Sequence, residues 1–179
     1  MNIYIAMLRG INVSGQKKII MAELIAHLEE LNFENIQTYI QSGNVIFEKD
    51  NTTAEELEIA IADKIMEKYG FEVPVLIKTP EELEYVLANN PFINKQNKDP
   101  KRIYVTFLSE DPPEENIPRL SEVDYNPEEF ILDGTTIYFY SPDNYGNAKM
   151  NNNFFEKKLK VSATTRNWNT VNKLVEMAL

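Results

Sequence analysis

Residues 36–48 read Ile-Gln-Thr-Tyr-Ile-Gln-Ser-Gly-Asn-Val-Ile-Phe-Glu, with a strand-like stretch on each side of Gly43-Asn44. Gly-Asn is among the dipeptides that favour a tight turn between antiparallel strands. The segment therefore predicts a β-hairpin with strands at residues 36–41 and 44–48. Once this hairpin is placed, the elements on both sides of it can be assigned in order.

The residues that flank the hairpin predict an alternation of strands and helices. Residues 3–8 form a continuous apolar run typical of a buried strand, and apolar residues recur at helical spacing over residues 21–31. After the hairpin, residues 53–56 (Thr-Ala-Glu-Glu) have the pattern of a helix capping box, and residues 71–78 predict another strand. The resulting order, β-α-β-β-α-β, is that of a ferredoxin-like unit.

The second half of the chain predicts a similar order of elements. Thr79-Pro80 is a helix start, and that helix leads to residues 91–100, a polar segment with a proline at each end. The elements predicted beyond this segment are a strand at 103–108, a short broken helix within 111–122, strands at 129–132 and 136–141 around Asp133-Gly134, a helix at 151–159, an extended piece at 161–164 and a helix at 167–178.

We therefore predict an α+β protein in which two ferredoxin-like subdomains pack together and a C-terminal helix follows. The first subdomain covers residues 1–79, and a helix and linker cover residues 80–100. The second subdomain, with its C-terminal helix, covers residues 101–179.

The composition excludes several classes of function. The 179 residues include 28 acidic and 18 basic side chains, and the formal net charge of −10 argues against binding to long nucleic acids. Cysteine is absent and His27 is the only histidine, so we expect no metal site and infer no cofactor. No stretch has the length and apolarity of a membrane span, and no secretory signal pattern is present. We therefore expect a cytoplasmic protein without a membrane partner.

Acidic residues are missing from three segments of this acidic chain. Residues 1–22 contain Arg9, Lys17 and Lys18 but no Asp or Glu, and residues 35–47 contain no charge at all. Residues 157–175 contain five basic residues and no acidic one. Such an uneven distribution of charge indicates local surfaces of different sign. Solvent-facing lysines on a helix explain the same pattern without any site.

Three motifs resemble those of the bacterial domain of unknown function 1697 family, and they coincide with the acid-poor segments. They are Leu8-Arg-Gly-Ile-Asn-Val-Ser-Gly15, Thr38-Tyr-Ile-Gln-Ser-Gly-Asn-Val-Ile-Phe47 and Thr164-Thr-Arg-Asn-Trp-Asn-Thr-Val171, supported by Glu156-Lys-Lys-Leu159. The resemblance covers essentially the whole chain. It implies an α+β fold with ferredoxin-like subdomains and no established activity. This chain departs from the family's usual Gly-Gly at Ser14-Gly15. It also lacks the usual Arg and hydroxyl just before Lys149, which is kept.

The motif residues form a candidate site for a small anion. Arg9-Gly10-Ile11-Asn12 lies in a glycine loop between a predicted strand and helix, where backbone N–H groups can hold an anion. Residues 165–168 are predicted to open the last helix, at the positive end of its dipole. The residues expected to bind the ligand, at a cleft between the subdomains, are Arg9, Gly10, Asn12, Lys17, Ser42, Gly43, Asn44, Lys149, Arg166 and Asn167.

Structural roles explain the same residues without any ligand. Gly10 also fits a role in loop geometry, and Ser42-Gly43-Asn44 fits a hairpin turn. Trp168 fits a core anchor that docks the last helix, and His27 fits helix packing. No catalytic residue is assigned, and whether the protein is an enzyme stays open.

Two other functions stay open beside binding of a small, for example phosphorylated, anion. One is binding of single-stranded nucleic acid on a ferredoxin-like sheet, with Tyr4 and Phe47 as stacking residues, although the RNA-recognition signature is absent. The other is a protein-interaction or homo-oligomerisation module, in which strand edges and the aromatic run at 136–140 pair subunits.

Overall fold

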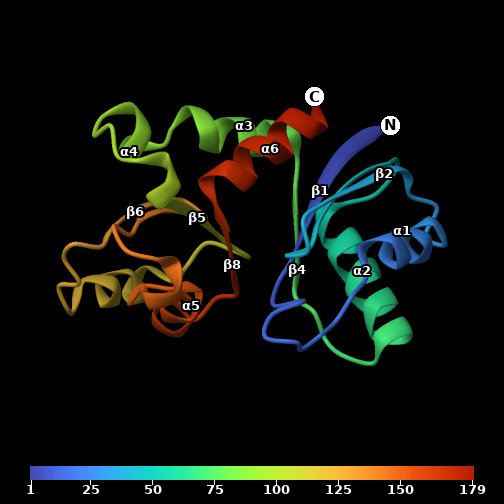
Figure 1. Cartoon of the computed structure of the whole chain (residues 1–179), viewed down its shortest axis with the longest axis horizontal. Helices are drawn as coiled ribbons and strands as arrows, with labels where there is room; N and C mark the ends of the chain where they lie inside the picture. The colour runs from blue at the N-terminus through green and yellow to red at the C-terminus, as the bar shows by residue number, and fades with distance from the viewer. The chain divides into compact units, whose positions relative to one another are not determined.

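The computed structural model describes residues 1–179 and divides into two compact units, which are described separately below. Unit 1 comprises Met1–Glu84 together with Leu174–Leu179, and unit 2 comprises Tyr85–Lys173. In sequence, unit 2 is therefore inserted between two segments of unit 1 (Figure 1).

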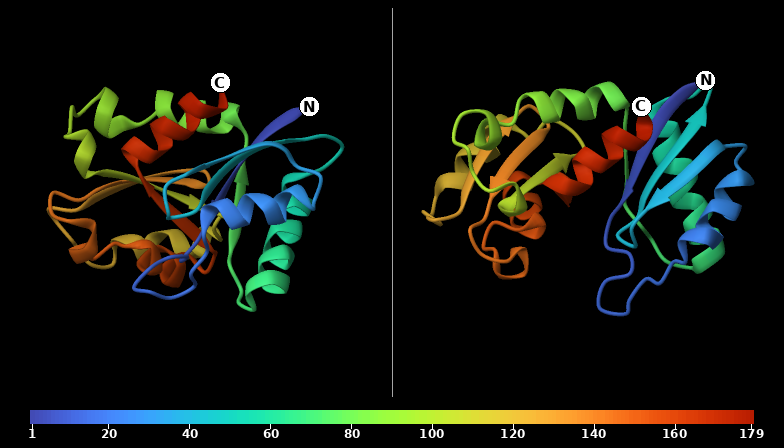
Figure 2. Two further views of the ribbon diagram at one scale, coloured as in Figure 1. Left: turned by 45° about the vertical axis from the view of Figure 1, so that its right-hand side comes forward. Right: turned by 45° about the horizontal axis from the view of Figure 1, so that its top comes forward.

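Unit 1 contains a four-stranded antiparallel sheet in the order β2-β3-β1-β4, with α1 and α2 against one of its faces (Figure 2). Its elements are β1 (Asn2–Leu8), α1 (Met21–Glu29), β2 (Glu34–Tyr39), β3 (Asn44–Lys49), α2 (Ala54–Tyr69) and β4 (Val75–Lys78). The start of α2 has the predicted capping box, because the Thr53 hydroxyl accepts from Glu56 N–H and the Glu56 carboxylate accepts from Thr53 N–H. Element order and strand order are those of a ferredoxin-like unit.

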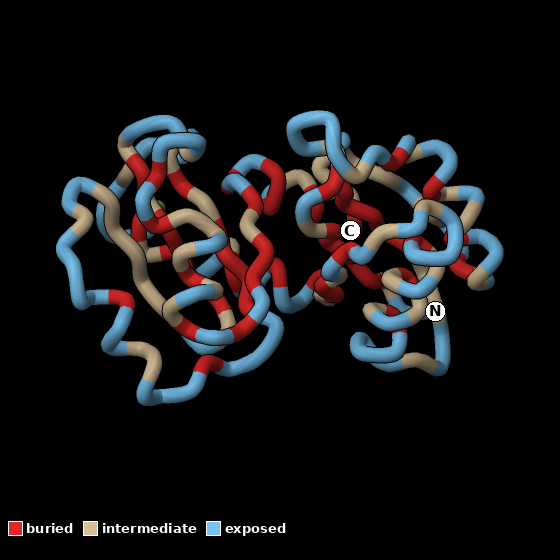
Figure 3. The backbone as a smooth tube through the Cα atoms, turned by 90° about the horizontal axis from the view of Figure 1, so that it is seen from below, coloured by how far each residue is buried: buried red, intermediate tan, exposed pale blue.

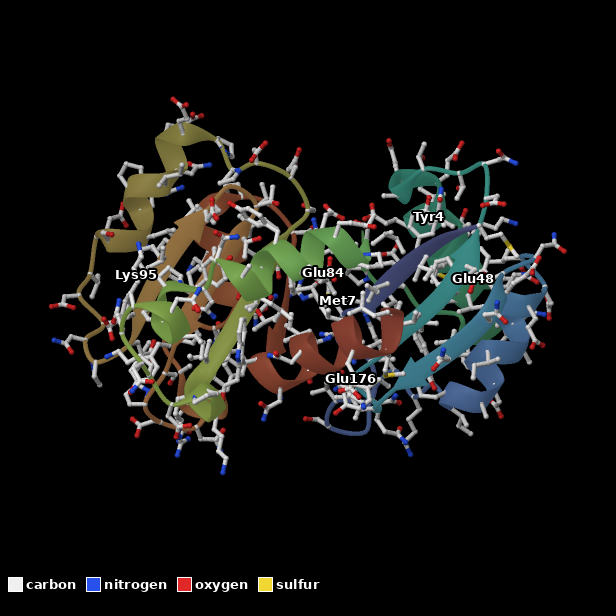
Figure 4. All side chains as sticks on the ribbon, turned by 90° about the horizontal axis from the view of Figure 1, so that it is seen from above. Tyr4, Met7, Glu48, Glu84, Lys95 and Glu176 are labelled. Carbon is white, nitrogen blue, oxygen red and sulfur yellow. The ribbon has the colours of Figure 1, made fainter.

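Both faces of this sheet are buried at its central strands, β1 and β3. Side chains alternate between the faces along β1, so Tyr4 points towards α1 and α2 whereas Met7 points away from them (Figure 4). Tyr4 and Phe47 belong to the core under the helices, and the Phe47 ring stacks on Phe33 at 4.3 Å. On the other face, Ile5 and Met7 are fully buried as well.

Unit 2 repeats the topology, with an antiparallel sheet in the order β6-β7-β5-β8. Its elements are α4 (Pro91–Asn94), η1 (Pro100–Arg102), β5 (Ile103–Leu108), η2 (Glu114–Ser121), β6 (Glu129–Asp133), β7 (Thr136–Tyr140), η3 (Tyr145–Asn147), α5 (Asn152–Leu159) and β8 (Ala163–Asn167). A 3₁₀ helix, η2, takes the place of the first α-helix of the ferredoxin-like order. In Figure 3, buried residues gather inside each unit and exposed residues lie along its outer connections.

Two further helices follow the last strands of the two sheets. Helix α3 (Pro80–Ala88) follows β4, and helix α6 (Trp168–Ala178) follows β8. Helix α3 begins in unit 1 and ends in unit 2, whereas α6 begins in unit 2 and ends in unit 1. Both starts have polar caps: Thr79 Oγ1 accepts from Glu82 N–H, and Asn167 Oδ1 accepts from Thr170 N–H.

The predicted fold class is confirmed, but several predicted boundaries are wrong. The first strand of the hairpin was predicted at 36–41 but runs from Glu34 to Tyr39, so the turn consists of residues 40–43. Residues 91–100 are not only a linker, since Asn90 caps the short helix α4 by accepting from Phe92 N–H. The last strand was predicted at 161–164 but extends to Asn167, where it pairs with β5.

Candidate functional site

Residues 9–20 form a long loop between β1 and α1. Five of them have positive φ, namely Gly10, Asn12, Ser14, Gly15 and Lys17. Helix α1 begins at residue 21, as the spacing predicted, so Arg9-Gly10-Ile11-Asn12 is separated from its N-terminus by the rest of the loop. The glycines at 10 and 15 have no atoms near a would-be Cβ, so their role is to permit the left-handed backbone.

Asn12 organises this loop with its side chain. The Nδ2 group donates to the carbonyl oxygens of Ile19 (3.0 Å) and Gln41 (2.8 Å), and Oδ1 accepts from Ile19 N–H (2.9 Å). The first and second sequence motifs therefore meet in space, as the loop is tied to the turn at residues 40–43. Both N–H groups and the oxygen of the Asn12 amide take part in this connection.

The turn at residues 40–43 packs tightly under the loop. Gly43 has a φ of 91°, and its carbonyl oxygen accepts from Leu8 N–H at 2.8 Å. A Cβ at this position would lie 2.6 Å from Ile11 Cδ1 and 2.8 Å from Leu8 Cβ. Asn44 is fully buried and donates to the Tyr39 carbonyl and to Ser42 Oγ. These contacts match the hairpin-turn interpretation of Ser42-Gly43-Asn44.

The basic residues of the loop differ in their surroundings. The side-chain Nζ of Lys17 donates to the Glu72 carbonyl at 2.6 Å. The backbone N–H of Arg9 donates to the Pro74 carbonyl at 3.0 Å. These bonds fix both ends of the loop to the segment before β4. Lys18, in contrast, is exposed and projects from the loop beside Ile19.

A surface pocket of about 290 Å³ lies where the loop meets the turn. It is lined by Asn12, Gly15, Lys18, Ile19, Ile20 and Gln41. Lys18 supplies the only formal charge of this lining, and no carboxylate is part of it. Ile20 occupies the N-cap position of α1 and makes no side-chain capping bond, so the first N–H groups of that helix lack a side-chain acceptor at the N-cap.

The predicted site residues of unit 2 occupy different surroundings. Arg166 lies in β8, opposite Val105, rather than at a helix start. Only 8% of Arg166 is exposed to solvent. Burial lowers the pKa of the Arg166 guanidinium to about 10. Asn167 caps α6, and Trp168 is buried as expected for a core anchor.

Lys149 and Arg166 are not brought together. The exposed Lys149 precedes α5, and its N–H donates to the Glu128 carboxylate at 2.7 Å. Thr165 donates through Oγ1 to Asn152 at the start of α5. Because side chains alternate along a strand, the neighbouring Arg166 points from the opposite face of the sheet.

One alternative function loses the residues on which it depends, and the other loses one of its two proposed surfaces. Tyr4 and Phe47, expected to stack on bases, are buried in the core under α1 and α2. The run at 136–140 is β7, which lies between β6 and β5 and is therefore not an edge available to a second subunit. Base stacking on Tyr4 and Phe47 and subunit pairing through residues 136–140 are therefore not supported, whereas pairing of subunits at the edge strands stays a prediction.

The pocket includes residues that sequence reasoning did not select as ligand-binding: Gly15, Lys18, Ile19, Ile20 and Gln41. The absence of acidic residues from 1–22 and 35–47 did point to both contributing segments. No group of three or more His, Asp or Glu side chains is placed to hold a metal ion, and no helix is long and apolar enough to cross a membrane.

Comparison with known proteins agrees with this description. Residues 1–138 match the family described as protein of unknown function (DUF1697), and the chain belongs to that family. Among solved structures, it is similar to the conserved bacterial protein SP0830 from Streptococcus pneumoniae, with a TM-score of 0.75 and 23% identity over 99% of both chains. That likeness shows a shared fold. No curated protein matches the sequence.

Proposed function

We propose that this protein binds a small anionic ligand, such as a phosphorylated metabolite, at the pocket between loop 9–20 and the turn of the first hairpin. The observation that carries the proposal is the charge of the lining: one exposed lysine and no carboxylate, in a chain with a net charge of −10. A lysine ammonium is a compact point charge that commonly contacts phosphate groups.

The start of α1 supports the same proposal. Ile20 lines the pocket and is also the N-cap residue, where it offers no side-chain acceptor to the helix. Uncapped N–H groups and the positive end of a helix dipole favour an anion at this position. Arg166 and Asn167 belong to unit 2, and the proposal for unit 1 does not depend on them.

Lys18→Gln tests this proposal, because it removes the charge from an exposed side chain and leaves the loop's hydrogen bonds intact. The matched control is Lys95→Gln, which changes the net charge equally at an exposed residue after α4 (Figure 4). The melting temperature of both variants and of the unaltered protein is measured against inorganic phosphate, sugar phosphates and nucleotides at constant ionic strength.

A ligand that binds the folded state raises the melting temperature by mass action. We expect at least one phosphate compound to raise the melting temperature of the unaltered protein and of Lys95→Gln. For Lys18→Gln, we expect the Kd of that compound to rise roughly fivefold, because a surface charge contributes about 1 kcal/mol to binding. Equal Kd values for the two variants would place the anion elsewhere, and no shift with any phosphate would refute the proposal.

A further inference from the structure

The side chain at position 20 does not suit the helix that it begins. Ile20 is 59% exposed, so it buries little apolar surface, and it leaves the N-cap of α1 without a side-chain acceptor. Ser, Thr, Asp and Asn are the residues that stabilise this position. Stability therefore does not explain an isoleucine here, whereas contact with an apolar group at the pocket does.

The polar groups around the pocket are few. Asn12 lines it, but both N–H groups and the oxygen of its amide already bond to Ile19 and Gln41. The remaining side-chain donors of the lining are Lys18 and the exposed amide of Gln41. A ligand with many hydroxyl groups would leave several of them without partners when bound, which costs free energy.

Two other apolar side chains of the loop and the turn are also exposed, although neither lines the pocket. Val13, in the same loop, is 58% exposed, and Ile40, in the hairpin turn, is 47% exposed. Ile19 forms the buried floor with 1% exposure. The volume of about 290 Å³ lies at the small end of ligand pockets, which suits a single ring with one anionic group.

From these observations we infer that the ligand is an organic monophosphate whose phosphate is joined to a small apolar group, the phosphate beside Lys18 and the apolar group against Ile20. This inference rests on the proposed function and names the class of its ligand. It distinguishes such compounds from free phosphate and from phosphates of polyhydroxylated carbon chains.

The test compares four small probes by isothermal titration calorimetry with the full chain: phenyl phosphate, glycerol 3-phosphate, inorganic phosphate and phenol. We expect phenyl phosphate to bind at least fivefold more tightly than glycerol 3-phosphate, because burial of one or two apolar carbons provides that gain in affinity. Phenol, which lacks the anion, should bind more weakly than phenyl phosphate.

Two variants locate the apolar contact. Ile20→Ala and Val13→Ala each shorten an exposed apolar side chain of the same loop, but only Ile20 lines the pocket. We expect Ile20→Ala to abolish the preference for phenyl phosphate and Val13→Ala to keep it. Ile20→Thr should raise the melting temperature by capping α1 while lowering phenyl phosphate affinity, so stability and binding change in opposite directions.

The outcomes separate this inference from the proposed function. If glycerol 3-phosphate binds as tightly as phenyl phosphate, or Ile20→Ala and Val13→Ala behave alike, the apolar contact is refuted and anion binding stands. If phenol binds as tightly as phenyl phosphate, the anionic part of the site is refuted. If none of the phosphates binds, both proposals fail.

Discussion

Units 1 and 2 have the same strand order but differ in the connection after the first strand. In unit 1, residues 9–20 form a long loop that Asn12 ties to the neighbouring hairpin turn. In unit 2, the shorter segment 109–113 ends in two prolines and leads to the 3₁₀ helix η2. The same topology thus has a pocket-forming loop in unit 1 and only a short connection in unit 2. This difference indicates that the loops, rather than the sheets, hold the functional differences.

The charges around the surface pockets of the two units also differ. The pocket beside loop 9–20 in unit 1 contains Lys18 and no carboxylate. A pocket of about 370 Å³ in unit 2 is lined by Asp124, Glu128 and Glu129 and by no basic residue. A phosphate is therefore expected to protect backbone amides of unit 1, and not those of unit 2, in hydrogen-exchange measurements.

The largest expected effect comes from the hairpin turns of the two sheets. Gly43→Ala would place Cβ 2.6 Å from Ile11 Cδ1, whereas Gly134→Ala meets no atom within 4 Å, although both glycines have positive φ. We expect Gly43→Ala to lower the free energy of unfolding by about 3 kcal/mol, through overpacking and backbone strain, and Gly134→Ala by about 1 kcal/mol. Urea denaturation followed by circular dichroism measures both, and equal losses would contradict the tight packing of loop on turn.

The second comparison concerns one asparagine in each unit. Asn12 and Asn152 each make three side-chain hydrogen bonds. Asn12 bonds to Ile19 within its loop and to Gln41 in the turn, and Asn152 bonds to Glu156 within α5 and to Ala163 and Thr165 in β8. Replacement of either by Ala should lower the free energy of unfolding by about 2 kcal/mol, because buried partners lose their bonds. Only Asn12→Ala should also abolish phosphate binding, as it releases the loop. A variant of Asn12 that binds phosphate normally would contradict the role of the loop.

The smallest effect concerns carboxylates at the surface. Hydrogen bonds from Lys68 and Lys64 lower the pKa of Glu30 in unit 1 to about 2, and Lys158 lowers the pKa of Glu122 in unit 2. A carboxylate whose pKa is lowered by folding stabilises the protein above its unfolded pKa, and this contribution is lost as the pH falls through the folded pKa.

We therefore expect the melting temperature to fall between about pH 5 and pH 2. Glu30→Gln should flatten this dependence more than Glu122→Gln, since Glu30 has two lysine partners and Glu122 one. Solvent exposure keeps both effects small. Identical dependence of the melting temperature on pH for the two variants would show that the second lysine partner of Glu30 adds nothing to stability.

Local patterns predicted most of the fold, because each depends on a few neighbouring residues. The capping residues at Thr53 and Thr79 lie where their spacing indicated, and the second hairpin turn lies one residue later than predicted, at residues 134–135. The end of β8 was missed, since Arg166 is held in a strand by pairing with Val105, which lies far away in sequence. The intrinsic strand propensity of a short segment does not report such long-range pairing.

The candidate site was predicted only in part, for a related reason. The sequence motifs suggested that residues near Asn12 and Gly43 act together, and the two segments do meet. Their polar atoms, however, bond mostly to each other, and the pocket is lined by neighbours such as Lys18 and Ile20. A motif marks residues that matter, but only the three-dimensional contacts distinguish those that build a loop from those that face solvent.

The path of α6 has a consequence for synthesis on the ribosome. The core of unit 1 under α1 and α2 consists entirely of residues 4–77, so it can form early in translation. Residues 174–179, which complete unit 1, emerge only after all of unit 2 has been made. The first unit to start folding is therefore the last to be finished, and a nascent chain stalled before residue 174 would carry a complete second unit and an incomplete first one.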